Sequence, residues 1–458
     1  MHMSSALMHG GPDAQGIPLH DFSTNANACG PCPAVLQAMA RAPAHTYPDP
    51  HYTALRARLA QWHGVDAARI VIGASASELI FRITAAMVRS AMQVGARATP
   101  SHASQPHASP LRARLAHVSL PRHGYGDYRR AAEGWGLPVA YWGAAHRDAA
   151  CGDEVDDDSN ANDNDNGNGN GNGNGEGEGD GDANGSAGSA PTRAASRATQ
   201  TIPRDPSGQH GIHLIWLTEP ASPLGDTPAE WHALLKQATR PGCVLVVDRA
   251  YAPLRLTGTD PLDAHSQARH LRDHVWQLFS PNKALGLTGV RGAYLIAPFL
   301  APGENPDTGI HSPPNILQAT PNILWEHLHA LAPSWPLGAH AEAMLMAWPT
   351  PDVQQWLKNC LPTLRDWKMQ LEAGLQARGW HVHPGCSTFC CARPPHSTAA
   401  AFVSRLRQHG IKLRDATPFG LPGWFRLGVR PPASQQALWK ALDGGWGECG
   451  GCGTGTNP

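Results

Sequence analysis

The sequence predicts an α/β protein: a large domain built on a mainly parallel sheet covered by helices, followed by a smaller C-terminal α+β domain. Between about residues 46 and 335, short apolar runs of β-forming residues alternate with segments of helical spacing. This alternation is typical of a parallel sheet whose two faces are covered by helices. After about residue 340 a long helical stretch leads to short strands, and a chain of 458 residues is long enough for two to three domains.

Local patterns predict the individual elements in chain order. Helical spacing predicts helices over 52–63, 77–90 and 227–239, the last with Thr227 as N-cap and Pro228 as its first residue. Short runs of β-forming residues predict strands over 69–72, 115–120, 213–218, 243–247, 274–279 and 293–297. In the C-terminal part we expect a helical stretch over 337–377, strands near 380–383, 388–392 and 424–429, and a helix over 397–409.

Four segments follow from these patterns: an N-terminal arm (1–45), the large domain (46–335), the small domain (336–445) and a flexible Gly-rich tail (446–458). Residues from about 151 to 200 are a low-complexity stretch without Val, Ile, Leu or aromatic residues after Val155. Such a composition cannot offset the entropy of ordering, so we expect a disordered surface insertion that splits the large domain. Residues 95–112 are interpreted as a second, shorter loop insertion.

The net charge of −1 hides an uneven distribution of charge. Residues 153–182 contain eleven acidic residues and no Lys or Arg, which leaves 26 acidic residues against 36 basic ones in the rest of the chain. Only six of these bases are Lys, and arginine suits the recognition of carboxylates and phosphates. We find no compact basic run of the kind that favours nucleic-acid binding. Small anionic substrates are therefore expected, and a nucleic-acid partner is not.

Several other classes of protein are also not expected. No run of 18 apolar residues predicts a transmembrane helix, and the first residues do not resemble a secretory signal, so a cytoplasmic location is expected. Ten cysteines are too few for a disulfide scaffold. The CxxC pairs Cys29/Cys32 and Cys449/Cys452 have the spacing of zinc ligands but lie at opposite ends of the chain, so reduced thiols without a metal are the preferred interpretation.

The strongest local signal is SPNKALGLTGVRGAY at residues 280–294, where Lys283 follows a predicted strand among several glycines. Burial lowers the pKa of a lysine and frees its amine as a nucleophile, which suits a Schiff base with an aldehyde. Ser280, three residues before Lys283, and Arg291, eight residues after it, could hold a phosphate by hydrogen bond and by charge. This motif predicts a reactive lysine beside an anion site.

A carboxylate stands at the end of a second apolar run, VLVVDRAY. Asp248 is expected at the carboxyl end of a buried parallel strand, where α/β enzymes bind ligands, and Tyr251 follows three residues later. Asp248 could hold a protonated pyridine nitrogen and Tyr251 a phenolate oxygen, which together would complete an electron sink. A helix cap or turn is the competing interpretation of Asp248 alone.

With these motifs the chain resembles the fold-type-I pyridoxal-phosphate enzymes of the class I/II aminotransferase family. The resemblance implies an internal Schiff base between Lys283 and the cofactor, with Asp248 and Tyr251 as ring contacts. Further residues carried over from the family are Ala76 and Ser77 in GASASELI for the cofactor phosphate, Tyr125 in HGYGDY for ring stacking, Tyr47 in YPDPHY for the partner subunit's cofactor phosphate, and Arg426 in FRLGVR for the substrate carboxylate. A homodimer whose active site is completed by the partner subunit is also implied.

The turn EPASPLG at 219–225 departs from the family pattern, because Ser222 stands where an asparagine usually touches the phenolate oxygen of the cofactor. Serine is shorter than asparagine, so a bridging water is expected there. Two further segments, HGGPDA (9–14) with DFSTNAN (21–27), and LRDATPFGL…FRLGVR (413–430), resemble L-threonine O-3-phosphate decarboxylases. That resemblance implies His9, Asn27 and Arg414 as substrate ligands, with His9 and Arg414 on its phosphate.

Decarboxylation of L-threonine O-3-phosphate in cobalamin biosynthesis is the activity preferred from these segments. Histidinol-phosphate aminotransferases share YPDP and the lysine motif but lack the HGG element, so amino transfer to 2-oxoglutarate is the alternative activity. The two reactions differ in which bond of the substrate's Cα stands perpendicular to the conjugated ring. A third hypothesis is a protein that binds the cofactor without turnover.

Overall fold

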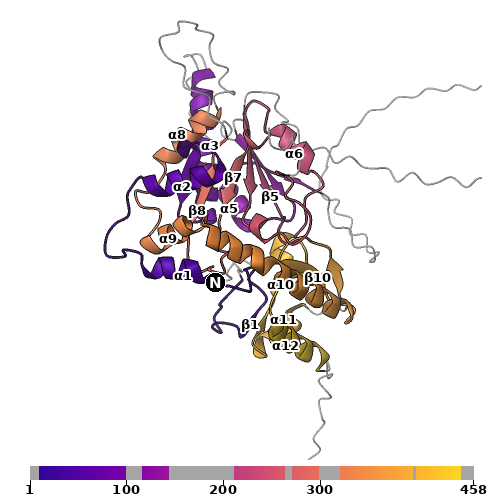
Figure 1. Ribbon diagram of the computed structural model, residues 1–458. Helices are drawn as coiled ribbons and strands as arrows, with labels where there is room; N and C mark the ends of the chain where they lie inside the picture. Colours follow the sequence, from indigo (N-terminus) through magenta and orange to yellow (C-terminus); the bar gives the residue numbers. More distant parts are fainter. Residues whose placement is uncertain are drawn as a thin grey trace, which may run out of the picture. The chain divides into compact units, whose positions relative to one another are not determined.

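The computed structural model describes residues 10–98, 116–143, 211–263, 271–298, 320–395 and 399–444. Within them, a seven-stranded sheet has the strand order β2-β8-β7-β6-β5-β3-β4 (Figure 1). Neighbouring strands are parallel except at β8, which is antiparallel to both β2 and β7. The strands are β2 (Ile70–Gly73), β3 (Ala116–Pro121), β4 (Val139–Trp142), β5 (Ile212–Thr218), β6 (Cys243–Asp248), β7 (Trp276–Phe279) and β8 (Ala293–Ile296). The predicted α/β fold with a mainly parallel sheet is confirmed.

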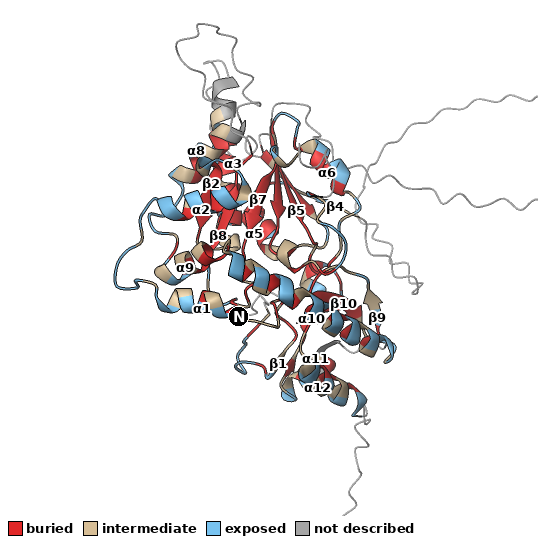
Figure 2. Cartoon of the chain, in the orientation of Figure 1, coloured by how far each residue is buried: buried red, intermediate tan, exposed pale blue. Residues whose placement is uncertain are grey.

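Helices cover both faces of this sheet, because alternate residues of the inner strands point into different apolar cores. In β5, Leu214 and Trp216 pack in the core that includes α3, α5 and α8, whereas Ile215 and Leu217 pack in the core that includes α6. Figure 2 shows the inner strands buried. The helices named are α3 (Ala76–Ala98), α5 (Gly126–Gly134), α6 (Trp231–Gln237) and α8 (Thr320–Ala330). A third core joins β2 and β8 to α1 (Pro33–Ala40), α2 (Thr53–His63) and α9 (Ala339–Ala347).

The C-terminal part contains a four-stranded antiparallel sheet with the order β12-β13-β10-β9. Its strands are β9 (His381–His383), β10 (Phe389–Arg393), β12 (Arg414–Asp415) and β13 (Phe425–Gly428), and its helices are α10 (Pro351–Gln376), α11 (Ala399–Gln408) and α12 (Pro432–Asp443). In β12 and β13, Arg414 lies directly opposite Arg426. The small α+β unit predicted from the sequence is therefore present, while the domain boundaries remain a prediction.

The N-terminal segment is attached to this C-terminal part. Its strand β1 (His20–Asp21) pairs in parallel with β11 (Ile411–Lys412), and Phe22 is fully buried in the core beneath α10 and α11. Asp13 forms ion pairs with Arg407 and Lys412. The segment from Gly10 to Phe22 is thus held against the C-terminal part of the chain, before the first strand of the seven-stranded sheet.

Three predictions about elements need correction. The helical stretch over 337–377 is two helices, α9 and α10, because Pro351 begins a new helix after a turn. Helix α6 begins at Trp231, and Thr227 does not cap it, since its hydroxyl donates to Glu219. Helix α3 continues to Ala98, into the loop predicted over 95–112. The rest of that loop from residue 99 on, the insertion at 151–200, the tail at 446–458 and the pair Cys449/Cys452 lie outside the described residues.

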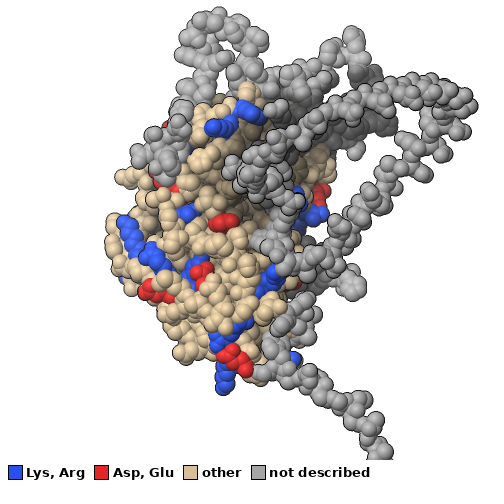
Figure 3. Space-filling view, turned by 90° about the vertical axis from the view of Figure 1, so that its right-hand side faces the viewer, with Lys and Arg blue, Asp and Glu red and all other residues tan. Residues whose placement is uncertain are grey.

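Much of the chain's arginine is inside the fold. Arg69, Arg82, Arg249, Arg414 and Arg426 are all buried. On the face shown in Figure 3, the basic side chains are scattered among acidic and uncharged ones. The excess of arginine is therefore used partly in internal contacts. No helix in the described part of the chain combines the length and the apolar character that a membrane span requires.

Candidate active site

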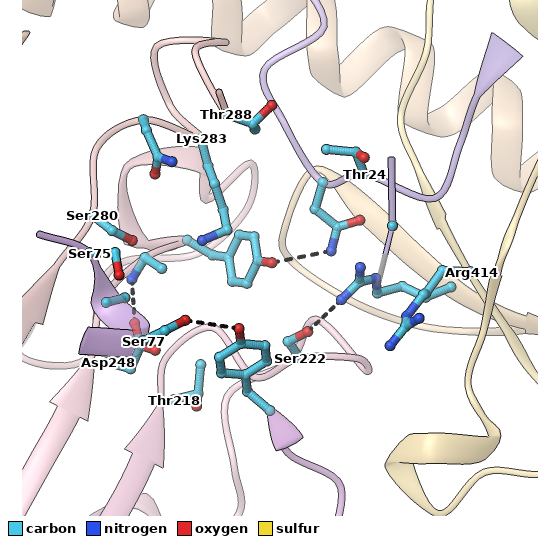
Figure 4. Close-up of a pocket in the computed structure, with 18 of the residues that line it drawn as sticks. Thr24, Ser75, Ser77, Thr218, Ser222, Asp248, Ser280, Lys283, Thr288 and Arg414 are labelled. Atoms are coloured by element: carbon cyan, nitrogen blue, oxygen red, sulfur yellow. Dashed lines mark hydrogen bonds between the residues drawn. The ribbon is translucent and has the colours of Figure 1, made fainter. Parts of the chain in front are cut away.

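A cavity of about 270 Å³ lies at the carboxyl ends of β5 and β6, the position where open α/β sheets bind ligands. Thr218 and Asp248 reach it from the ends of these strands, Lys283 from the loop after β7, and Arg414 from the small sheet (Figure 4). Its lining includes most of the predicted site residues: Ala76, Ser77, Tyr125, Ser222, Asp248, Tyr251, Ser280, Lys283, Arg291, Arg414 and Arg426. These residues come from six separate parts of the sequence and meet at one cavity.

Lys283 lies in the loop between β7 and β8, with its amine 5.3 Å from the centre of the Tyr251 ring. Its backbone carbonyl accepts a hydrogen bond from the Asn27 amide. In the same loop, Ser280 is buried, and its hydroxyl has no hydrogen-bond partner among the described residues. A buried hydroxyl without a partner costs free energy, so Ser280 is a candidate ligand contact.

Asp248 ends β6 with its carboxylate in the cavity. Oδ2 accepts a 2.6 Å hydrogen bond from the Tyr128 hydroxyl, and Oδ1 accepts one of 2.9 Å from the amide of Ala250. The second bond is the local turn contact that the competing interpretation expected. Asp248 thus stabilises a turn and also faces the cavity.

The N-terminus of α3 lines the cavity through Ser75, Ala76 and Ser77. Ser75 accepts a hydrogen bond from the Glu78 amide and so caps the helix, and Ala76 and Ser77 begin it. The Ser77 hydroxyl lies 3.1 Å from that of Tyr125, and burial raises the pKa of Tyr125 to about 12, so this tyrosine stays protonated. Helix N-termini attract anions, and Arg291 lines the same cavity.

Two arginines form the end of the cavity beside the small sheet. Arg426 donates to the Ser222 hydroxyl at 3.0 Å and to the Ser23 carbonyl at 3.2 Å. Ser222 is thus engaged with an arginine, which sequence reasoning did not expect. Burial first, and then the neighbouring charge of Arg426, lower the pKa of Arg414 to about 10. In the described part of the chain neither guanidinium is paired with a carboxylate.

Asn27 does not line the cavity, so its expected position is corrected. Its side-chain Nδ2 donates to the Ala284 carbonyl at 3.0 Å, and its Oδ1 accepts from the backbone amide of Cys29, so Asn27 supports the loop that carries Lys283. Asn25 lines the cavity instead. Its Nδ2 lies 3.5 Å from the Tyr251 hydroxyl, and its Oδ1 is buried without a partner in the described residues.

Two predicted residues are not part of the cavity of their own chain. Tyr47 is 80 % exposed and stacks on Trp335, with ring centroids 4.7 Å apart. His9 lies outside the described residues, although the adjacent Gly10 lines the cavity. Sequence reasoning also missed Tyr128 and Thr218; the Tyr128 hydroxyl bonds to both Asp248 and Thr218 and so joins distant parts of the chain.

A mainly parallel sheet with a lysine, a carboxylate and a helix N-terminus around one cavity matches the α/β fold of the fold-type-I class. The sequence model of the family "Aminotransferase class I and II" matches residues 17–108 and 195–443, well over half of the chain, and the chain belongs to this family.

Individual relatives and solved structures agree with this assignment. The histidinol-phosphate aminotransferase of Jannaschia sp. (strain CCS1) is 25 % identical over 426 residues, which cover 92 % of this chain and 89 % of the relative. The structure of L-threonine-O-3-phosphate decarboxylase from Porphyromonas gingivalis aligns with a TM-score of 0.57 at 17 % identity, over 92 % of this chain and 98 % of that one. Histidinol-phosphate aminotransferase from Sinorhizobium meliloti, in complex with pyridoxal-5'-phosphate, aligns with a TM-score of 0.57 at 19 % identity, over 92 % and 88 %. These structural likenesses concern the fold.

Proposed function

We propose that the cavity binds pyridoxal 5'-phosphate through Lys283. The fit rests on the donor set and on buried polar atoms that have no partner among the described residues, such as the Ser280 hydroxyl and Asn25 Oδ1. The start of α3, Ser280 and Arg291 would hold the phosphate, Asp248 the ring nitrogen, Tyr251 the phenolate oxygen and Tyr125 a ring face. When bound, the cofactor supplies an electron sink for negative charge at the Cα of an amine substrate. The Lys283 amine would accept the proton from that Cα.

The observation that carries the substrate class is the pair Arg414 and Arg426. The two buried guanidinium groups stand opposite each other on β12 and β13, and two such charges repel at close range. An anionic substrate group relieves that repulsion and makes charge-assisted hydrogen bonds to both. A small amine or amino acid that carries a phosphate, a carboxylate or both fits this end of the cavity.

For the reaction, we favour amino transfer from a histidinol-phosphate-type substrate to 2-oxoglutarate. This choice is supported by the curated relatives, among them the Jannaschia enzyme that aligns with most of the chain, and it reverses the preference drawn from the sequence. Arg414 and Arg426 would bind the phosphate of histidinol phosphate in the first half of the reaction and the carboxylates of 2-oxoglutarate in the second half.

Decarboxylation of L-threonine O-3-phosphate is the second candidate, and one observation favours it. Gly10, Ser23, Thr24 and Asn25 line the cavity beside Arg414, and they belong to the N-terminal segment that resembles the decarboxylases. Loss of CO₂ requires the α-carboxylate to be held out of the ring plane, and a second arginine beside the first would serve that purpose.

We also propose a homodimer. Tyr47 is largely exposed and stacked on Trp335, which is itself 46 % exposed. Large contiguous apolar patches mark interaction surfaces, and this stacked pair is a candidate centre for one. In a dimer, Tyr47 would reach the cofactor phosphate of the partner subunit.

The cofactor is tested with purified protein incubated with pyridoxal 5'-phosphate. The wild type is expected to show the visible absorption of an imine and a borohydride-reducible linkage, and Lys283→Ala is expected to lose both. Lys358→Ala, at an exposed position on α10, is the matched control and should retain both. A reducible linkage that persists in Lys283→Ala would assign the amine to another residue.

The reaction is tested in two tubes. Histidinol phosphate with 2-oxoglutarate is expected to yield glutamate without CO₂, and L-threonine O-3-phosphate alone is expected to yield nothing. CO₂ from the second tube and no glutamate from the first would replace amino transfer by decarboxylation. A protein that holds the cofactor and turns over neither substrate would support the non-catalytic hypothesis.

A further inference from the structure

Tyr128 is the last residue of HGYGDY, a motif in which only Tyr125 was given a role from the sequence. It lies on α5, is 1 % exposed, and stacks on Trp216 with ring centroids 4.6 Å apart. Its hydroxyl donates a 2.6 Å hydrogen bond to Oδ2 of Asp248. A hydroxyl carries one proton, so Thr218, whose Oγ1 lies 3.1 Å away, must donate to Tyr128 in turn. Thr218, Tyr128 and Asp248 therefore form a directed chain of hydrogen bonds at the floor of the cavity.

We propose that Tyr128 is a positioning residue that orients Asp248 toward the nitrogen of the cofactor ring, an inference that rests on the proposed function. The amide of Ala250 holds the other carboxylate oxygen at 2.9 Å. Two donors, one on each oxygen, fix the plane of the carboxylate. Both donors also stabilise its negative charge, which is the form that holds a protonated ring nitrogen.

The surroundings of Tyr128 suit this role. Its ring is held between the faces and edges of Trp216 and Tyr125, so the hydroxyl has little freedom to leave Asp248. Burial, followed by the charge of Asp248, raises the pKa of Tyr128 well above its usual range. In the folded protein near neutral pH, the hydroxyl therefore keeps its proton and can donate it in a hydrogen bond to Asp248.

The test uses Tyr128→Phe, which keeps the stacked ring and removes only the hydroxyl. Two dissociation constants are measured by absorption: that of pyridoxal 5'-phosphate and that of its analogue with the ring nitrogen replaced by CH. We expect a loss of about tenfold or more in affinity for the cofactor, as for a lost hydrogen bond to a charged group. Affinity for the analogue should stay unchanged, because it offers Asp248 no nitrogen to hold.

Tyr52→Phe is the matched control, because the Tyr52 hydroxyl also makes two hydrogen bonds, both with the backbone of Leu337 outside the cavity. It should leave both affinities unchanged. In an Asp248→Asn background, Tyr128→Phe should have no further effect on cofactor binding, since Tyr128 acts through Asp248.

Equal losses for the cofactor and the analogue, or an undiminished effect in the Asp248→Asn background, would overturn the proposal and leave Tyr128 a structural role. If Tyr128→Phe lowers the melting temperature far more than the control does, the two dissociation constants are measured with Thr218→Val instead. That variant should lose affinity for the cofactor, by a smaller factor, and keep its affinity for the analogue. Equal losses for the two compounds in Thr218→Val would also overturn the proposal. A wild-type protein that binds neither compound would instead refute the proposed cofactor.

Discussion

Arg414 and Arg426 are a pair of like charges that the fold itself holds in place. Residues directly opposite each other in an antiparallel pair are close neighbours, and both side chains are buried. Hydrogen bonds to Ser222 and the Ser23 carbonyl fix Arg426, whereas Arg414 lies over the ring of Phe419, 5.2 Å from its centre. The pKa of Arg414 is lowered only to about 10, so its guanidinium remains charged near neutral pH, and burial lowers the pKa of Arg426 as well.

The two arginines should differ in the substrate group they serve. Arg414→Ala should lower kcat/KM for a phosphorylated substrate by about tenfold or more, since a charge-assisted hydrogen bond contributes about 1.5–3 kcal/mol. The same variant should change kcat/KM for the unphosphorylated analogue much less. Arg426→Ala should weaken every substrate with an α-carboxylate alike, phosphorylated or not.

Arg378→Ala is the control for this experiment, because Arg378 forms its ion pair with Asp443 away from the cavity. Steady-state kinetics with each substrate pair provide the measurement. An Arg414→Ala variant that lost equal activity toward phosphorylated and unphosphorylated substrates would contradict a phosphate-binding role.

The residues that sequence could identify are those in compact local motifs. Lys283 and Arg291 are eight positions apart, and Asp248 ends an apolar strand; short spacing makes such patterns visible before any fold is known. The bond between Tyr128 and Asp248 spans 120 positions, and the one between Arg426 and Ser222 spans 204. Only the folded sheet brings those residues together, so their partners could not be predicted.

Among the elements that the sequence predicted, the strands agree with the structure better than the helix boundaries do, although β4 and β12 were not predicted. The interiors of β5 (Leu214–Leu217) and β6 (Val244–Val247) are apolar because helices cover both faces of the sheet, and this gives a continuous signal. The start of a helix depends on single residues. Pro351 begins α10 and separates it from α9, and the Thr227 hydroxyl donates to Glu219 instead of capping α6. The pairing of β1 with β11 joins residues about 390 positions apart and left no local pattern.

The long connection between β4 and β5 is an element whose length can be changed. β4 ends at Trp142 and β5 begins at Ile212, and β3 lies between them in the sheet. Deleting residues 152–190 would leave about 30 residues, each reaching up to about 3.3–3.6 Å, ample to return along strands of this length. Since loop closure costs only about 0.6 kcal/mol per doubling of length, stability should rise by less than about 1 kcal/mol.

This deletion is checked by the midpoint of urea unfolding and by kcat/KM with the substrate that the wild type uses. Both should stay close to wild type. The control is a protein in which the same 39 residues are kept but their order is shuffled. It shows whether an effect of the deletion comes from the lost sequence or from the lost length. A deleted protein that does not fold or does not turn over would show that the segment does more than connect two strands.

At the scale of the whole molecule, the fold encloses histidine side chains in part, as well as burying arginine. His63, the last residue of α2, lies with its Nε2 2.9 Å from the Tyr294 hydroxyl and its ring against Phe279. Burial, followed by the charges of Arg249 and Arg272, lowers the pKa of His63 to about 3. His329 shows the same trend, with burial lowering its pKa to about 4. Both rings are therefore neutral in the folded protein.

These histidines should make the folded protein sensitive to mild acid. In the unfolded chain a histidine takes up a proton below about pH 6.5, while folded His63 does not until about pH 3. The stability contributed by neutral His63 is thus complete above pH 6.5 and is lost as the pH falls from 6.5 toward 3, by at most about 1.4 kcal/mol per pH unit. His63→Gln, which can still bond to Tyr294, should flatten the fall of unfolding free energy between pH 6.5 and 5. The measurement is urea unfolding at several pH values, and His409→Gln, a change at an exposed histidine, is the control. If the unfolding free energy falls with pH equally steeply in the wild type and in His63→Gln, His63 is not a source of the acid sensitivity.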